Sequence, residues 1–172
     1  MRRPHTPATT RLKERWAELR LEGKFTVDAP PEHCLSRLRD PLWLGKCLPN
    51  LSSLELIGDK EFRAVFYLNL AEMAKVAGYL SRIRTDMRFT YMETSPGEVR
   101  VAGDGRAVGA KISIDISVRV SSKDDGSVLE WVSIVDLGII QRLLGEETVR
   151  RVADKQIGLL TNCLSEALRK GV

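Results

Sequence analysis

The sequence predicts one α+β domain: a curved antiparallel sheet of seven strands around a long C-terminal helix, with two short helices after the first strand. Two observations predict this class. Seven segments alternate apolar and polar residues with a period of two, which is typical of strands that bury one face. After Gly138 the apolar period becomes three or four residues, which is typical of one long amphipathic helix. Such a helix would cover the inner face of the sheet.

Local signals set the order of the elements. Pro30 and Pro31 preset the first turn of a helix, and the Asp40-Pro41 pair ends it. The glycines of GDGRAVG (103–109) suit a turn or a bulge after a strand. The expected helices before the sheet's second strand are 29–38 and 42–47, and the expected strands are 20–28, 51–57, 61–70, 81–92, 98–103, 112–120 and 128–136.

Composition limits the class of protein. The 172 residues, 43% hydrophobic and 29% charged, fit one soluble globular domain. No apolar run reaches the about 18 residues that span a bilayer, and no signal-peptide core follows Arg2 and Arg3. We therefore expect a cytoplasmic protein. The content of only three Asn and two Gln is typical of a thermophilic source.

The net charge of +4 does not indicate nucleic-acid binding, because the excess lies in residues 1–20 and the rest is neutral. We divide the chain into a basic N-terminal extension (1–19) and a domain (20–172). In the extension, a short helix is expected in which Leu12, Trp16 and Leu19 share one side. Two interpretations stay open: a loosely attached extension, or a segment that lies peripherally on the inner face of an anionic membrane.

Residues able to hold metals or act as nucleophiles are few. The spacing of Cys34, Cys47 and Cys163 indicates neither a disulfide framework nor a zinc site, so we expect free buried thiols. His5 and His33 are the only imidazoles, and His33 is expected on the surface of a short helix. We therefore predict no catalytic residues, no metal site and no cofactor.

Three stretches carry a resemblance to a known family. LEGKFTVDAPPE (21–32), DPLWLGKCLPN (40–50) and LELIGDKEFRAVFYLNL (54–70) resemble the CoxG family, named for the G subunit of carbon monoxide dehydrogenase, within the START-like or Bet v 1-like (SRPBCC) superfamily. The similarity in order and pattern extends over about residues 20–170. It implies the helix-grip fold, in which a seven-stranded sheet grips the long helix around a hydrophobic pocket.

The resemblance also implies a function. Family members accompany molybdenum-containing carbon monoxide dehydrogenases and are thought to recruit the enzyme to the membrane or to carry a lipophilic molecule such as a quinone. Unlike relatives with a lysine- and glycine-rich hairpin, this chain has the apolar AEMAKVAGYL (71–80), which suits a pocket rim or an oligomer contact. Relatives with a C-terminal membrane-binding segment continue beyond the point where this chain ends. Anchoring would therefore rest on the extension or on this hairpin.

The inward-facing side chains form the candidate ligand site. Four residues that interrupt apolar faces, Thr85, Tyr91, Ser133 and Gln156, would orient the ligand. The alternative is a filled core in which these groups are satisfied. The apolar lining is expected to be Phe66, Leu68, Ile83, Met87, Phe89, Ile114, Ile116 and Trp131 from the strands, with Val152, Leu159 and Leu160 beside Gln156 on the helix.

Three functions remain open from the sequence. The first is a non-catalytic module that holds a small hydrophobic ligand for a molybdenum hydroxylase-type enzyme. The second is an enzyme of the cyclase or hydrolase kind, with Tyr91 as acid or base in the same pocket. The third is an assembly or membrane-recruitment factor that acts through its surface. A stripe of outward-facing arginines is either a solvated face or a dock for an acidic partner; it comprises Arg82, Arg84 and Arg88, with Arg100, Arg106 and Arg119 nearby.

Overall fold

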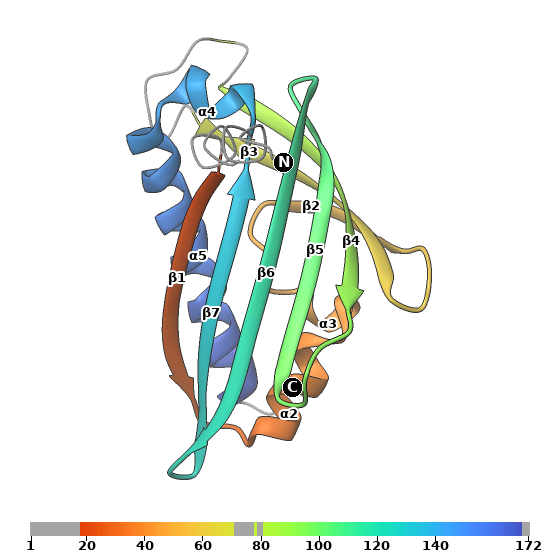
Figure 1. Cartoon of the computed structure of the whole chain (residues 1–172), viewed down its shortest axis with the longest axis vertical. Helices are drawn as coiled ribbons and strands as arrows, with labels where there is room; N and C mark the ends of the chain where they lie inside the picture. Colours follow the sequence, from red (N-terminus) through yellow and green to blue (C-terminus); the bar gives the residue numbers. More distant parts are fainter. Residues whose placement is uncertain (1–17, 71–77, 79–80, 170–172) are drawn as a thin grey trace, which may run out of the picture.

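The computed structural model describes residues 18–70, 78 and 81–169. Within them a single antiparallel sheet curves around a long helix (Figure 1). The elements are β1 (Glu18–Val27), α2 (Pro31–Leu38), α3 (Pro41–Leu44), β2 (Leu51–Leu56), β3 (Glu61–Asn69), β4 (Arg82–Met92), β5 (Glu98–Ala107), β6 (Ala110–Lys123), β7 (Gly126–Asp136), α4 (Ile139–Leu144) and α5 (Glu146–Arg169).

The order of strands across the sheet is β1-β7-β6-β5-β4-β3-β2. Strands β2 to β7 follow one another as antiparallel neighbours, and β1 pairs with the last strand, with Glu18 opposite Asp136. The segment with α2 and α3 therefore passes from one edge of the sheet to the other and lies across one end (Figure 1). The predicted fold, seven antiparallel strands with two short helices after the first, is confirmed.

Strand β5 corrects one prediction. The glycines after residue 103 were expected in a turn or bulge, but β5 continues through them to Ala107, and the turn falls at Val108 and Gly109. The reason is close packing. A Cβ on Gly105 would lie 1.9 Å from the Asp86 carbonyl oxygen, and one on Gly103 would lie 2.6 Å from the Phe89 ring. These glycines let neighbouring strands and side chains approach rather than reverse the chain.

The C-terminal helix also differs from the expectation of one long helix after Gly138. Gly145 has a φ of 86°, in the left-handed region, and separates the short α4 from the 24-residue α5. Apolar spacing persists across the break, which is why periodicity alone did not reveal it. The first strand differs too: Leu19, expected on a helix of the extension, is 2% exposed within β1. Residues 1–17 and the 71–80 hairpin, apart from Gly78, lie outside the described residues.

The cysteine prediction was wrong for two of the three residues. Cys47, just after α3, and Cys163 of α5 form a disulfide with their Cα atoms 5.4 Å apart. They are 116 residues apart in sequence, so only the folded chain reveals the pairing. Cys34 is free and buried, as expected.

Two groups of buried side chains hold α5 against the rest of the molecule, one at each end of the helix. Toward its C-terminus the group includes Leu164 and Leu168 of α5 with Cys34, Leu38 and Trp43 from α2 and α3. Near its N-terminus the group includes Val152 of α5 with Ile83, Met87, Ile112 and Ile140. The middle of α5 stands over the sheet between these two packed regions.

Candidate ligand-binding site

A cavity of about 280 Å³ lies beneath the middle of α5, against β1, β7 and β6. Almost all of its wall is carbon, because the inward positions of these strands are apolar. The strands contribute Leu21, Phe25, Ile114, Ile116, Val118, Leu129, Trp131, Ser133 and Val135; α5 contributes Ala153, Gln156, Ile157, Leu160, Thr161 and Leu164; Leu38 and Pro49 close one side. We call this the large chamber.

A second apolar cavity of about 210 Å³, the small chamber, continues from the first toward α4. The two chambers share Leu21, Val135 and Ala153 as lining residues. Ala153 is the only one of the three on α5, and its single methyl group keeps the junction narrow on the helix side without filling it. The remaining wall includes Leu68, Leu70, Ile83, Thr85, Ala107, Ile112, Leu137, Ile140, Leu144, Val149 and Val152.

The position of α5 explains why the chambers lie on one side of the sheet. The helix runs behind β1 and β7 (Figure 1), so these strands and β6 face it. Under β3 and β4, aromatic rings fill the concave face instead. The Phe62 and Phe89 rings stack with centroids 5.0 Å apart, and Phe66 meets Phe89 edge-on at 6.5 Å. Such pairs pack at normal contact distance and leave little room for a ligand.

The fifteen predicted site residues therefore separate into three groups. Phe66, Met87 and Phe89 belong to packed core, Leu159 is 49% exposed, and Tyr91 faces a different groove. Leu68, Ile83, Thr85 and Val152 line the small chamber. Ile114, Ile116, Trp131, Ser133, Gln156 and Leu160 line the large one.

Several lining residues were missing from the predicted site although their pattern was visible. Leu21 and Phe25 alternate in β1, and Val118, Leu129 and Val135 continue the inward faces of β6 and β7. Alternation gives the face on which a side chain lies. It does not say which strands the helix covers, so the predicted site was centred too far toward β4.

Polar groups on the large chamber are few. Gln156 lies on the cavity side of α5, and its Oε1 accepts a hydrogen bond from Asn50 Nδ2, which ties the helix to the segment before β2. Ser133 is 7% exposed in the opposite wall. These two residues give the chamber polar groups on its two sides, which suits a ligand that is apolar except for one or two polar atoms.

Tyr91 does not reach either chamber. Its hydroxyl donates a 2.7 Å hydrogen bond to the Leu38 carbonyl oxygen and lies beside a separate groove of about 410 Å³ whose lining includes Arg39, Lys60 and Arg100. Burial, with a smaller contribution from the Asp40 carboxylate, raises the pKa of Tyr91 above its ordinary value. The hydroxyl thus stays protonated and holds α2 to β4, so acid or base chemistry by Tyr91 in the apolar pocket is not supported.

Other reactive groups are sparse in the described part of the chain. His33 is half-buried rather than on the surface, and its Nε2 is buried without a hydrogen-bond partner among the described residues. Burial of the α2 face against the sheet end explains this difference. Residues 18–70, 78 and 81–169 contain no cluster of three or more His, Cys, Asp or Glu side chains suited to a metal ion. None of the helices described there is long and apolar enough to cross a bilayer.

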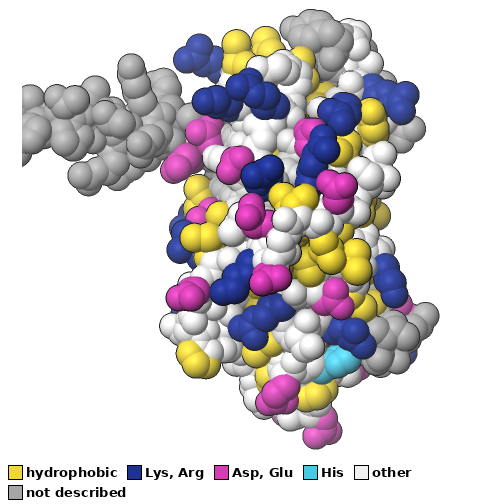
Figure 2. Space-filling view, turned by 90° about the vertical axis from the view of Figure 1, so that its right-hand side faces the viewer, with side chains coloured by type: hydrophobic (Ala, Val, Ile, Leu, Met, Phe, Trp, Pro, Cys, Tyr) yellow, Lys and Arg dark blue, Asp and Glu magenta, His cyan; other side chains and the backbone are white. Residues whose placement is uncertain are grey.

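The outward arginines are partly paired within the sheet. Arg63 makes a two-pronged contact with Asp86, which also lies 3.7 Å from Arg84. These cations hold the pKa of the Asp86 carboxyl below its usual value. Arg100 pairs in the same way with Asp115. Figure 2 shows basic and acidic side chains interspersed on the face it presents, which favours the solvated-face interpretation.

Comparison with known proteins places this geometry in a family. The profile of the CoxG family, the G subunit of carbon monoxide dehydrogenase, matches residues 23–169. No curated protein matches the chain. Solved structures share the fold at low identity, and they include members of the START-like and Bet v 1-like superfamily.

Three of these structures illustrate the likeness. A conserved protein from Geobacillus kaustophilus has a TM-score of 0.74 at 18% identity, over 88% of this chain and 96% of its own. The protein TTHA0849 from Thermus thermophilus has a TM-score of 0.59 at 17% identity, over 90% and 98%. The Zhui aromatase/cyclase from Streptomyces sp. R1128 has 0.57 at 16%, over 90% and 96%. Helix-grip architecture, an apolar chamber under α5 and a profile match over most of the sequence lead to one conclusion: the chain belongs to the CoxG family of carbon monoxide dehydrogenase subunits.

Proposed function

We propose that this protein is a binding module that holds a small hydrophobic ligand, lipid-like or quinone-like, between the sheet and α5. The observation that carries the proposal is the large chamber: about 280 Å³ of space with an almost entirely apolar wall. A dry apolar cavity of about 150 Å³ is enough to bind benzene. The large chamber therefore has room for a substituted ring or a branched chain segment.

The energetics favour an apolar ligand. Each methylene group moved from water into such a wall contributes about 0.8 kcal/mol, so a ligand must bury many carbons to outweigh the cost of its immobilisation. A strongly polar ligand would lose hydration and find only Ser133 and Gln156 to replace it. The small chamber, which shares Ala153 with the large one, offers space for a chain that extends past the ring.

The proposal has a second part, which concerns partners. Family membership supports a role as accessory protein to a molybdenum-containing oxidoreductase of the carbon monoxide dehydrogenase type. The bound molecule would then be one that the enzyme or its membrane surroundings supply or accept. Analytical ultracentrifugation with such an enzyme tests this part: a complex supports it, and independent sedimentation at micromolar concentrations contradicts it.

The binding proposal is tested first by native mass spectrometry of the purified protein, followed by organic extraction of whatever accompanies it. We expect a stoichiometric apolar molecule, or uptake of N-phenyl-1-naphthylamine and of short-chain quinones by the empty protein. A clean mass without uptake of any of these probes would contradict a ligand-binding role.

A pair of variants tests the position of the ligand. Ala153→Leu adds an isobutyl group at the junction of the two chambers, and we expect it to weaken probe binding by about tenfold, because the ligand loses contact volume. The matched control is Ala102→Leu, which adds the same group on β5, where Ala102 alternates with the inward-facing Gly103. Equal probe affinity of both variants and the unchanged protein would place the ligand elsewhere. Fluorescence titration measures all three.

A further inference from the structure

We propose that the Cys47–Cys163 disulfide is a redox-controlled latch on the ligand cavity, which slows ligand exchange when it is closed and allows it when it is reduced. The inference rests on the proposed function, because a latch on the cavity matters only if the cavity takes a ligand.

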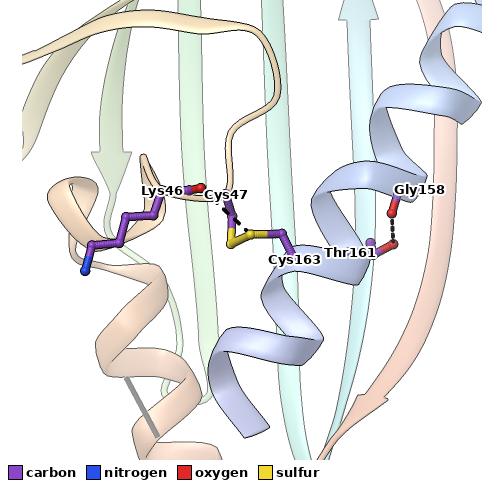
Figure 3. Close-up of a disulfide and its surroundings, with 5 residues drawn as sticks. All are labelled: Lys46, Cys47, Gly158, Thr161 and Cys163. Atoms are coloured by element: carbon purple, nitrogen blue, oxygen red, sulfur yellow. Dashed lines mark hydrogen bonds between the residues drawn. A yellow bond between two sulfur atoms is a disulfide. The ribbon is translucent and has the colours of Figure 1, made fainter. Parts of the chain in front are cut away.

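The disulfide lies at the seam where α5 meets the segment between α3 and β2 (Figure 3). Both sides of this seam belong to the wall of the large chamber. Pro49 follows Cys47 by two residues, while Leu160, Thr161 and Leu164 surround Cys163 on α5. A covalent bond between the two sides thus fixes the distance between two parts of the cavity wall.

Little else joins the two sides near the cavity. The Asn50–Gln156 hydrogen bond crosses the seam. The Thr161 hydroxyl instead bonds within α5, to the carbonyl oxygens of Ile157 (2.9 Å) and Gly158 (3.3 Å) (Figure 3). A single side-chain hydrogen bond contributes about 1 kcal/mol. Once the disulfide is open, the seam can therefore part at modest cost.

The rest of the molecule is arranged to survive this opening. Beyond the seam, Leu164 and Leu168 remain packed with Leu38 and Trp43. At the other end of α5, Val152 remains packed against the group near α4. The reduced protein should keep its fold, because these contacts do not depend on the disulfide, while the segment 45–50 gains freedom to move away from α5.

The two sulfur atoms differ in access. Cys47 is 5% exposed, whereas Cys163 is partly exposed. A small dithiol reductant would therefore attack the Cys163 sulfur: its thiolate forms a mixed disulfide with Cys163, the S–S bond breaks, and Cys47 leaves as a thiolate that takes up a proton. The second thiol of the reductant then displaces Cys163 as a thiol. The protein gains two electrons and two protons, and the reductant is oxidised to its own disulfide.

Cys34 provides an internal control. It is fully buried, accepts no disulfide partner in the described structure, and burial raises the pKa of its thiol. A Cys34→Ala variant should keep the Cys47–Cys163 bond and its response to reductant. Differential alkylation with mass spectrometry verifies the pairing: unfolding alone should expose one alkylatable cysteine, and unfolding with reductant should expose three. Three reactive cysteines without reductant would overturn the proposal at once.

The decisive experiment measures the rate at which N-phenyl-1-naphthylamine leaves the protein, by stopped-flow dilution with and without dithiothreitol. We expect release to be about tenfold faster after reduction, since barriers to ligand exit act mainly on dissociation rates. Reoxidation should restore the slow rate, and the Cys47→Ser, Cys163→Ser double variant should release quickly in both conditions. Because wild-type protein is compared with itself, the result does not depend on how well the variant folds.

Two outcomes would overturn the latch, and they differ in what they say of the proposed function. Equal release rates in both redox states, with a lower thermal stability after reduction, would make the disulfide a purely structural link while ligand binding stands. No probe binding in either state would remove the proposed function and the latch together.

Discussion

Tyr91 shows how one side chain can suit catalysis by sequence and serve structure in the fold. Its hydroxyl lies outside both chambers and donates to the Leu38 carbonyl. We expect Tyr91→Phe to lower the free energy of unfolding by about 1 kcal/mol, because the carbonyl loses its donor. Probe affinity should stay unchanged. Urea denaturation measures the first quantity and fluorescence titration the second; a large fall in affinity with intact stability would return Tyr91 to the ligand site.

The same residue predicts a dependence on alkaline pH. The pKa of Tyr91 is raised in the folded protein, while the unfolded tyrosine ionises near its ordinary value of about 10. Above about pH 10 the unfolded state therefore releases a proton that the folded state keeps, and stability falls as pH rises. Wild type should lose stability in this range more steeply than Tyr91→Phe, so the difference between them should shrink. Parallel slopes in urea titrations between pH 8 and 11 would contradict the assignment.

At the scale of single residues, the sequence predicted faces better than places. Ile114, Ile116, Trp131 and Ser133 were predicted to face inward and do line the large chamber. Phe89 shares their parity but stacks on Phe62 in packed core. The difference depends on which strands α5 crosses, and a period of two contains no such information.

Strand β5 carries a prediction about glycines. Gly105→Ala should lower the free energy of unfolding by about 3 kcal/mol, because its Cβ would lie 1.9 Å from the Asp86 carbonyl oxygen and would push β4 and β5 apart. Gly158, on α5, is the matched control: a Cβ there has no atom within 4 Å outside the helix's own nearby backbone. Gly158→Ala should raise stability by about 1 kcal/mol, since alanine favours helix. Thermal and urea denaturation measure both. Similar effects of the two substitutions would show that strand spacing does not depend on Gly105.

Elements as a whole were predictable where a periodic pattern was long. Strands β4, β6 and β7 and the amphipathic C-terminal region followed from alternation and from helical spacing. The break at Gly145 and the continuation of β5 through Gly105 did not follow, because glycine serves both turns and close packing. Only the atoms near a glycine decide between these uses.

For the whole molecule, the disulfide predicts a measurable difference in stability. It links Cys47 and Cys163 across 116 residues, so it restricts a large loop of the unfolded chain. Reduction should lower the free energy of unfolding by about 2–4 kcal/mol and the Tm by about 5–15 °C. Calorimetry with and without dithiothreitol checks this, with the Cys34→Ala variant expected to respond like wild type. An unchanged Tm would indicate that the bond is absent in solution or closes a loop already restricted when unfolded.

The fold of the whole chain was predicted, whereas the disulfide was not. Alternating strands followed by one amphipathic region admit few architectures, because the helix must cover the one apolar face of the sheet. The pairing of Cys47 with Cys163 depends on where the segment after α3 crosses α5, a long-range distance that no local spacing encodes.

The pairing of β1 with β7 also bears on how the protein is made. The first strand leaves the ribosome more than a hundred residues before its partner, since Glu18 lies opposite Asp136. Until β7 emerges, the apolar face of β1 has no neighbour in the sheet, and α5, which covers both, follows later still. Completion of the fold is therefore delayed until synthesis is nearly over. Contacts of such long sequence separation favour slow folding, and the nascent chain is a natural client for chaperones during that interval.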